Sequence, residues 1–331
     1  MHIVKSLHGG ILHKTFAYQG RHIFALSALW AFRLSDGRPV IEPKMWQAIA
    51  DSMEEPALLD MAMPKENAEF LVRGACVAPR GEPIEAAQVR VRLGDREKRI
   101  HVFGDRHWVR AAGIGLTPSR PEPFTRMPIN FGRAFGGAGH DPNPFGKGFR
   151  PVEIDGMERH PLPNLERPGQ IIGAPDDRPR PISLDAMDVT LASRQALAGT
   201  YDDKYIRERM PGLPDDIDWA FFQGAQKDQR FDGKLSGSEA YEIDNMNAEH
   251  SVLRGTLPGV RARLFIRRLD ADGNPEFKEL KGAIDTVWFL PEQDLGVVIE
   301  RATIACQDPL GEDISGCLTA HEGRDDPRRS L

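Results

Sequence analysis

The sequence has few of the residues that hold together a disulfide-rich or zinc-stabilised protein. Its 331 residues contain three cysteines, Cys76, Cys306 and Cys317, and no two of them form a close CxxC pair. An odd and sparse set of cysteines argues against a disulfide framework and against a structural zinc site. It favours single thiols in a reducing compartment.

Long hydrophobic runs are also missing. The longest apolar stretch, Ile23 to Phe32, is interrupted by Ser27. It falls far short of the ~20 residues that a membrane span requires. The N-terminal segment has no apolar core and no small-residue cleavage site, so it does not resemble a signal peptide. The sequence therefore predicts a soluble protein that stays in the cytoplasm and has no membrane partner.

An excess of basic charge is absent as well. The chain contains 43 Lys and Arg against 49 Asp and Glu, which gives a formal net charge of −6. Proteins that bind nucleic acids usually carry a basic excess, because much of their affinity comes from neutralising phosphates. The charge gives no support to a nucleic-acid partner, and it suits a protein partner with a basic surface better.

The residues that are present indicate a globular protein rich in turns. The 32 glycines and 26 prolines favour many turns and short strands over long helices. Alternating apolar and polar residues, separated by turn residues, predict strands at 24–34, 70–77, 89–93, 99–103, 260–266, 286–290 and 297–299. Sequential hairpins of this kind predict a mainly β fold, either an antiparallel β-sandwich or barrel-like sheets.

The middle of the chain differs from its two ends. Residues 118–181 hold 13 of the 26 prolines and show no sustained period of 2 or 3.6. Several phenylalanines in this segment can anchor it on a core. We therefore expect a long, ordered, Pro/Gly-rich irregular excursion over the sheets.

Short helices are expected after this excursion, within residues 190–223. They are predicted at 191–197, at 202–210 with Asp202 as N-cap and Pro211 as the stop, and at 216–223. We expect a single β-rich domain over residues 1–307, followed by a frayed polar tail over residues 308–331.

Two glycine-rich segments, residues 134–139 and 145–148, superficially resemble phosphate-binding loops. A P-loop requires Ser or Thr after its GK pair, whereas here Gly148 follows the lysine. A structural role, with glycines at positive φ in tight loops, is favoured. Residues 270–274 begin like a calcium-binding loop, but Pro275 occupies the position of the required glycine, so a hairpin turn is expected there.

Clustered carboxylates leave an enzymatic alternative open. Two of Asp202, Asp215, Asp216 and Asp218 could form the acid/base pair of a β-sandwich glycan hydrolase. Nothing in the sequence sets their separation, and helix N-capping explains at least one member of each group. We therefore expect no catalytic residue, no metal site and no cofactor.

The segment Gly104-Asp105-Arg106-His107-Trp108 predicts a sharp corner. Its glycine lets the chain bend, its Asp and Arg can pair across the bend, and its Trp can anchor it. The corner either faces a partner or is purely structural. Spacing does not separate the two, and the structural interpretation is favoured because such pairs often satisfy loop backbone.

The order of these unusual segments resembles a known family. The series consists of Gly104–Trp108, Phe124-Thr125-Arg126-Met127-Pro128-Ile129, Ala134–Gly137, Asn143–Phe149, Pro161-Leu162-Pro163-Asn164-Leu165-Glu166, Ala198-Gly199-Thr200-Tyr201-Asp202 and Arg209–Asp218. It is similar to the bacterial domain-of-unknown-function 2169 family, whose members occur beside type VI secretion effectors and spike proteins. The resemblance covers Ile3 to Cys306.

The resemblance implies a cytoplasmic adaptor or chaperone. Such a protein binds one effector and helps load it onto the valine-glycine-repeat spike or the spike-tip protein, without being an enzyme. The residues expected to contact the partner are Arg106, Trp108, Phe135, Asn143, Phe145, Arg194, Tyr201 and Asp216. A structural part of the type VI apparatus is the second alternative, beside the glycan hydrolase.

Overall fold

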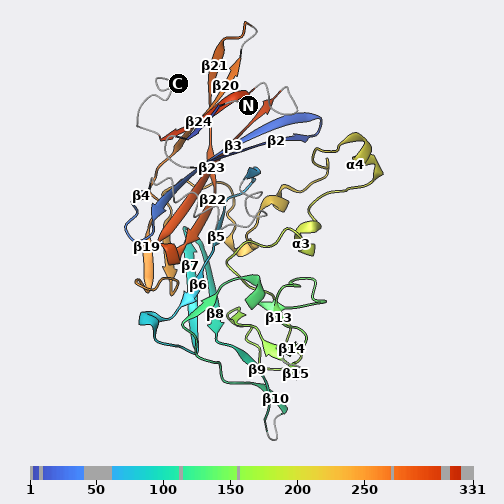
Figure 1. The fold of residues 1–331 in the computed structure, drawn as a ribbon, viewed down its shortest axis with the longest axis vertical. Coiled ribbons are helices and arrows are strands. Elements are labelled where there is room, and N and C mark those ends of the chain that lie inside the picture. The colour runs from blue at the N-terminus through green and yellow to red at the C-terminus, as the bar shows by residue number, and fades with distance from the viewer. Residues whose placement is uncertain are drawn as a thin grey trace.

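The computed structural model describes residues 3–6, 10–40, 62–111, 115–154, 157–269, 272–306 and 314–321. Across these residues the protein is mainly β, with several mostly antiparallel sheets, a few short helices and no closed barrel (Figure 1). The predicted mainly β fold is confirmed, and of the two predicted architectures the structure has the sandwich.

A six-stranded sheet forms the centre of the molecule. Its order is β2-β3-β23-β22-β5, with β4 paired to β3. The strands are β2 (Gly10–Tyr18), β3 (Arg21–Arg33), β4 (Pro39–Val40), β5 (Glu69–Val72), β22 (Ala283–Leu290) and β23 (Leu295–Cys306). The long strands β3 and β23 pair antiparallel over most of their length. Both faces of this sheet are covered, which explains the nearly unbroken apolar run of β3.

A five-stranded sheet packs on one face of the central sheet. Its order is β17-β8-β7-β18-β19. The strands are β17 (Leu165–Glu166), β8 (Arg96–Phe103), β7 (Ala86–Leu93), β18 (Ala240–Asp244) and β19 (Val252–Thr256). The predicted hairpin is confirmed, because β7 pairs with β8 from Ala86↔Phe103 to Leu93↔Arg96. Apolar and polar residues alternate along β7 because only one face of this sheet is buried, as the sequence predicted.

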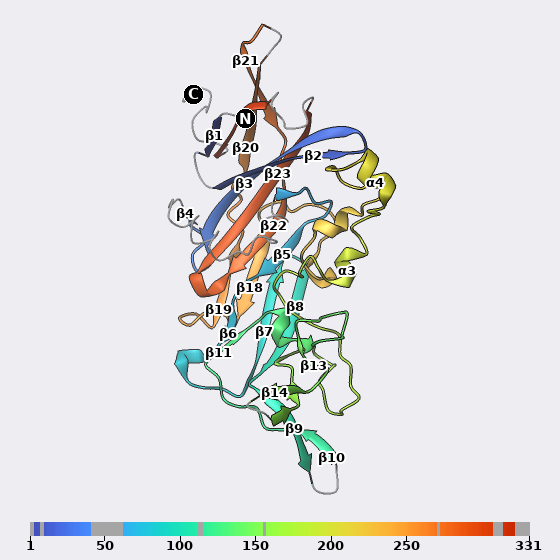
Figure 2. The same cartoon turned by 45° about the vertical axis from the view of Figure 1, so that its right-hand side comes forward.

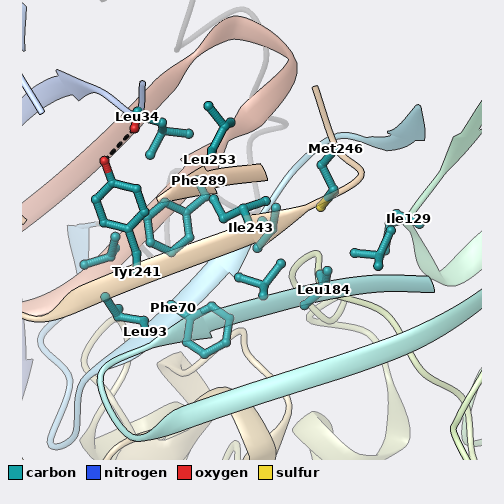
Figure 3. Packing of buried hydrophobic residues seen from close by; sticks show 14 of the residues in the cluster. Leu34, Phe70, Leu93, Ile129, Leu184, Tyr241, Ile243, Met246, Leu253 and Phe289 are labelled. Atoms are coloured by element: carbon teal, nitrogen blue, oxygen red, sulfur yellow. Dashed lines mark hydrogen bonds between the residues drawn. The ribbon is translucent and has the colours of Figure 1, made fainter. Parts of the chain in front are cut away.

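The main core lies between these two sheets (Figure 3). Phe289 of β22 lies at its centre, with its ring 5.7 Å from that of Tyr241 and 6.4 Å from that of Phe70. The Tyr241 hydroxyl donates a hydrogen bond of 2.7 Å to the carbonyl oxygen of Leu34. Burial raises the pKa of Tyr241 to about 12. The aromatic rings therefore join the two layers, and the buried hydroxyl has its partner.

A four-stranded sheet packs on the N-terminal half of β3 and the C-terminal half of β23. It contains, in order, β1 (Ile3–Ser6), β24 (Ile314–His321), β20 (Ala262–Leu269) and β21 (Pro275–Leu280). Phe24 and Leu26 of β3 contact Leu264 and Ile266 there. Here the expectation of a frayed tail over residues 308–331 is wrong for β24. This strand pairs with β20 and β1 and buries Ile314, so its backbone is held on both sides.

Other boundaries differ from the sequence prediction. The single strand expected at 70–77 is two strands, β5 and β6 (Ala75–Val77), and β6 pairs instead with β11 (Arg126–Pro128). The strand expected at 297–299 is the twelve-residue β23. Cys76 of β6 is a buried free thiol whose pKa burial raises to about 12.

In its described residues, the expected excursion is ordered and takes part in short ladders, some of them with the strands just before it. They involve β9 (Arg106–Ala111), β10 (Gly115–Pro118), β12 (Phe135–Gly136), β13 (Lys147–Gly148), β14 (Val152–Ile154), β15 (Met157–Arg159) and β16 (Pro161–Leu162). Single 3-10 turns lie at η1 (Pro79–Gly81), η2 (Phe131–Arg133) and η5 (Pro291–Gln293). Phe135 and Phe149 of this segment belong to a satellite core, and the excursion occupies one end of the molecule (Figure 2).

Short helices follow, as predicted, and none of those in the described ranges is long and apolar enough to cross a membrane. They are α3 (Ala192–Gln195), α4 (Asp203–Glu208), η3 (Trp219–Phe222) and η4 (Lys227–Gln229). Asp202 caps α4 as predicted, because its Oδ1 accepts a 2.8 Å hydrogen bond from the Tyr205 backbone N–H. The third helix begins at Trp219 and not at Asp216, because Asp218 is its N-cap.

Candidate partner-binding surface

Four of the eight residues expected to contact a partner are buried: Arg106, Phe135, Asn143 and Arg194. Their side chains contact the protein's own backbone and core. We therefore correct the expectation of direct partner contact for these four. The other four, Trp108, Phe145, Tyr201 and Asp216, are at least partly exposed.

The corner at Gly104 is built by two separate ion pairs. Arg106 pairs with buried Glu166, lies 3.9 Å from the centre of the Phe103 ring, and donates to the carbonyl oxygen of Pro163 at 2.9 Å. Asp105 instead accepts a 2.8 Å bond from Lys147 Nζ. The expected Asp105–Arg106 pair is therefore replaced by two longer-range contacts, each of which ties the corner to the excursion.

Asn143 holds the glycine-rich loops together. Its Nδ2 donates to the carbonyl oxygens of Phe131 at 2.8 Å and Phe135 at 3.1 Å. A Cβ on Gly136, whose φ is +154°, would lie 2.1 Å from the Asn143 carbonyl oxygen. A Cβ on Gly146 would lie 2.4 Å from Nδ2. The glycines are thus required for close packing around one amide, which supports the structural interpretation of these loops.

Phe135, Trp108 and Arg194 anchor neighbouring segments. Phe135 lies in the satellite core, and half-buried Trp108 packs against it. Arg194 of α3 donates from Nε to the Phe221 carbonyl oxygen at 3.0 Å and from Nη1 to that of Met187 at 2.8 Å. The guanidinium therefore stabilises the loop around α3.

Exposed apolar side chains gather on the projection that carries α4. Tyr201, Ile206 and Met210 are 55%, 56% and 64% exposed. Ile206 lies in α4, and Met210 lies in the turn directly after its C-cap, Arg209. We call these three residues the α4 patch. The projection lies at the edge of the molecule in both views (Figures 1 and 2).

Phe145 is a second exposed aromatic residue, with 50% of its surface accessible, but it lies on the excursion. Sequence reasoning singles out Tyr201 and Phe145 and misses Ile206 and Met210. The signal that could have found these two is their i, i+4 spacing within an otherwise polar segment.

Two of the segments that resemble the family, Ala198–Asp202 and Arg209–Asp218, flank α4 and close the base of the projection. Asp216 accepts hydrogen bonds from the Thr200 backbone N–H at 2.9 Å and from its hydroxyl at 2.7 Å. These bonds hold the pKa of Asp216 below its ordinary value. The Leu213 N–H donates to the Ala17 carbonyl oxygen of β2 at 2.8 Å. The apolar patch is therefore presented on an anchored loop.

The clustered carboxylates already have structural partners. Asp202 and Asp218 are N-caps, and Asp216 accepts from Thr200. Asp215 accepts a 2.7 Å bond from Arg209 Nε. The arrangement supplies local capping and pairing for each of the four.

Replacing Gly199 by alanine is expected to destabilise the base of the projection. Gly199 has φ +83°, and a Cβ there would lie 2.8 Å from Pro214 Cβ. We expect Gly199→Ala to lower the free energy of unfolding by about 2–3 kcal/mol, from backbone strain and overpacking. Urea denaturation measures this change.

The control for this substitution is Gly169→Ala. Gly169 has φ +78°, and no atom lies within 4 Å of the position that an alanine Cβ would occupy, so only the strain of about 1 kcal/mol applies. Equal losses for the two variants would show that packing against Pro214 contributes nothing.

The model of a family described as "Uncharacterized protein conserved in bacteria (DUF2169)" matches residues 19–301. No curated protein and no solved structure matches the chain. The matched range includes the five-stranded sheet, the excursion, the α4 projection and the central sheet apart from β2 and the end of β23.

Proposed function

Because the chain belongs to the DUF2169 family of bacterial proteins, we propose that it is a cytoplasmic adaptor or chaperone for a type VI secretion effector. It binds the effector and helps load it onto the valine-glycine-repeat spike or the spike-tip protein. The ordered series of sequence motifs supports this role. The protein acts by binding and not by catalysis.

The observation that carries the proposal is the α4 patch. Three large apolar side chains are exposed on one short projection. Both ends of that projection are held by hydrogen bonds of segments that resemble the family, from Thr200 to Asp216 and from Leu213 to Ala17. Clustered exposed apolar residues mark protein–protein contact sites more often than scattered ones. Tyrosine and methionine are both enriched at such interfaces.

The test uses the full chain and the type VI effectors and spike proteins of its own bacterium. Each is purified and titrated against the chain by isothermal calorimetry. We expect one effector to form a stable complex, and the double variant Ile206→Asp with Met210→Asp to bind at least about ten-fold more weakly, because buried interface residues dominate affinity.

The matched control is Val252→Asp. Val252 is 43% exposed on β19, so the variant adds a charge to an exposed apolar position away from α4. It should bind the effector as the unaltered chain does. The absence of any complex would overturn the adaptor proposal, and appearance of the protein itself among the fired components would favour the structural-component alternative.

A further inference from the structure

A cleft of about 440 Å3 lies beside α3, between the end of the excursion and η4. Its wall contains the apolar residues Pro181, Met187 and Leu197. Five cationic residues also line it, namely Arg167, Arg180, Arg194, Lys227 and Arg230, together with one carboxylate, Asp228. Five positive charges and one negative charge leave an excess of four in a chain whose net charge is −6.

The single carboxylate of the cleft is already shared. Asp228 lies 2.8 Å from Lys98 Nζ and 3.0 Å from Arg167 Nη1. Lys98 lies behind the wall and is almost fully buried, which lowers its pKa to about 8. Asp228 therefore compensates two cations at once, Lys98 and Arg167.

The cations at the cleft differ in how they are held. Arg230 donates to the carbonyl oxygens of Ala225 at 2.8 Å and Gln223 at 3.0 Å. Arg180 and Lys227 are exposed. Within the part of the chain that the structure describes, neither has a carboxylate within 4 Å. The cleft thus combines fixed guanidinium groups with two cations that can turn toward a bound anion.

We propose that this cleft binds an acidic segment of a polypeptide. A glutamate or aspartate carboxylate of the segment is held by Arg180, Lys227 and Arg230, and its apolar neighbours pack on Met187 and Leu197. Arginine binds carboxylates well because its planar donors match the two oxygens. The inference rests on the proposed function, since the segment belongs to the effector.

Position and charge favour a polypeptide as the ligand. α3 carries two of the residues that line the cleft, Ser193 and Arg194, and it lies next to the α4 projection in both views (Figures 1 and 2), so a partner seated on the α4 patch is on the side of the molecule that carries the cleft. The acidic net charge of the chain disfavours a nucleic acid. A volume of about 440 Å3 accommodates a few side chains.

The test uses a fluorescent synthetic peptide in which glutamate and leucine alternate, with binding to the full chain followed by anisotropy. We expect binding that weakens as sodium chloride rises from about 0.05 M to about 0.5 M, because salt screens exposed charges. The variant Arg180→Glu with Lys227→Glu should bind at least about ten-fold more weakly. A peptide with lysine in place of glutamate should not bind.

The matched control is Arg254→Glu with Lys278→Glu, which makes the same change of charge at exposed positions of β19 and β21. It should bind the acidic peptide as the unaltered chain does. No binding at low salt, or equal loss in both double variants, would overturn the inference. Tighter binding of adenosine triphosphate than of the peptide, lost in the cleft variant, would also overturn it and assign the cleft to phosphates.

The peptide test is independent of the effector. The variant Ile206→Asp with Met210→Asp should bind the effector at least about ten-fold more weakly and should bind the acidic peptide as the unaltered chain does. Failure of the adaptor proposal therefore leaves peptide binding unchanged, whereas failure of the cleft inference leaves the α4 patch effect unchanged.

Discussion

Glu69→Ala is expected to lower the free energy of unfolding by about 3–5 kcal/mol, because it leaves a buried cation without its partner. Glu69 and Lys65 both have fully buried side chains, and Lys65 Nζ lies 2.6 Å from Glu69 Oε1. Glu69 also accepts hydrogen bonds from the backbone N–H groups of Gly224 at 3.2 Å and Ala225 at 3.1 Å. The variant therefore removes the buried ion pair with Lys65 and the two hydrogen bonds that fix β5 to the loop beside the cleft.

The control for this variant is Glu292→Ala. Glu292 pairs with Arg126 at 2.6 Å, but both side chains are partly exposed, so the expected loss is about 0–1 kcal/mol. Urea denaturation followed by tryptophan fluorescence measures both. Equal losses would show that burial adds nothing to the Lys65–Glu69 pair.

Phe289→Ala is expected to cost a similar amount, about 3–5 kcal/mol, through loss of buried apolar surface and the cavity left behind. The ring is fully buried between the two sheets, against Phe70 and Tyr241 (Figure 3). These neighbours belong to different layers, so they cannot close together without moving a sheet. Differential scanning calorimetry should show a single transition at a lower temperature.

Two further variants separate the volume effect from other causes. Phe289→Leu keeps most of the volume and should lose clearly less stability than Phe289→Ala. Phe145→Ala removes the same ring from a half-exposed position and should change the free energy of unfolding by no more than about 0.5 kcal/mol. A loss below about 1 kcal/mol for Phe289→Ala would mean that the sandwich repacks around the cavity.

Local features of the fold could be predicted from the sequence. Alternation in 89–93 and 99–103 predicts the β7–β8 hairpin, because one face of that sheet is buried and the other is solvated. Asp202 and Pro211 mark the ends of the segment that contains α4. In both cases the residues that predict the element lie within it or within a few residues of its ends.

Non-local features could not be predicted. Nothing in the apolar run of β3 specifies that β23 is its partner, and burial of both faces removes the alternation that would reveal the orientation of the strand. The sequence of β24 is only weakly apolar and therefore predicts a tail, because the strand is stabilised by its pairing with β20 and not by a local pattern.

The candidate sites show the same limit. The sequence marks Asn143 and Arg194 as unusual, but only the structure shows that their polar atoms are bound to the protein's own backbone. The cations of the cleft extend from Arg167 to Arg230 and form no local cluster. Only the fold brings them together.

The pairing of β3 with β23 also determines when the protein can fold during synthesis. Ala31 of β3 pairs with Val297 of β23, a separation of 297 − 31 = 266 residues. At the usual pace of translation, about 5–20 residues per second, the first of these residues leaves the ribosome many seconds before the second. Until then, the β2–β3 hairpin has an open apolar edge, which is a template for aggregation. The nascent chain is therefore itself a candidate client for the cell's general chaperones, whatever it later binds.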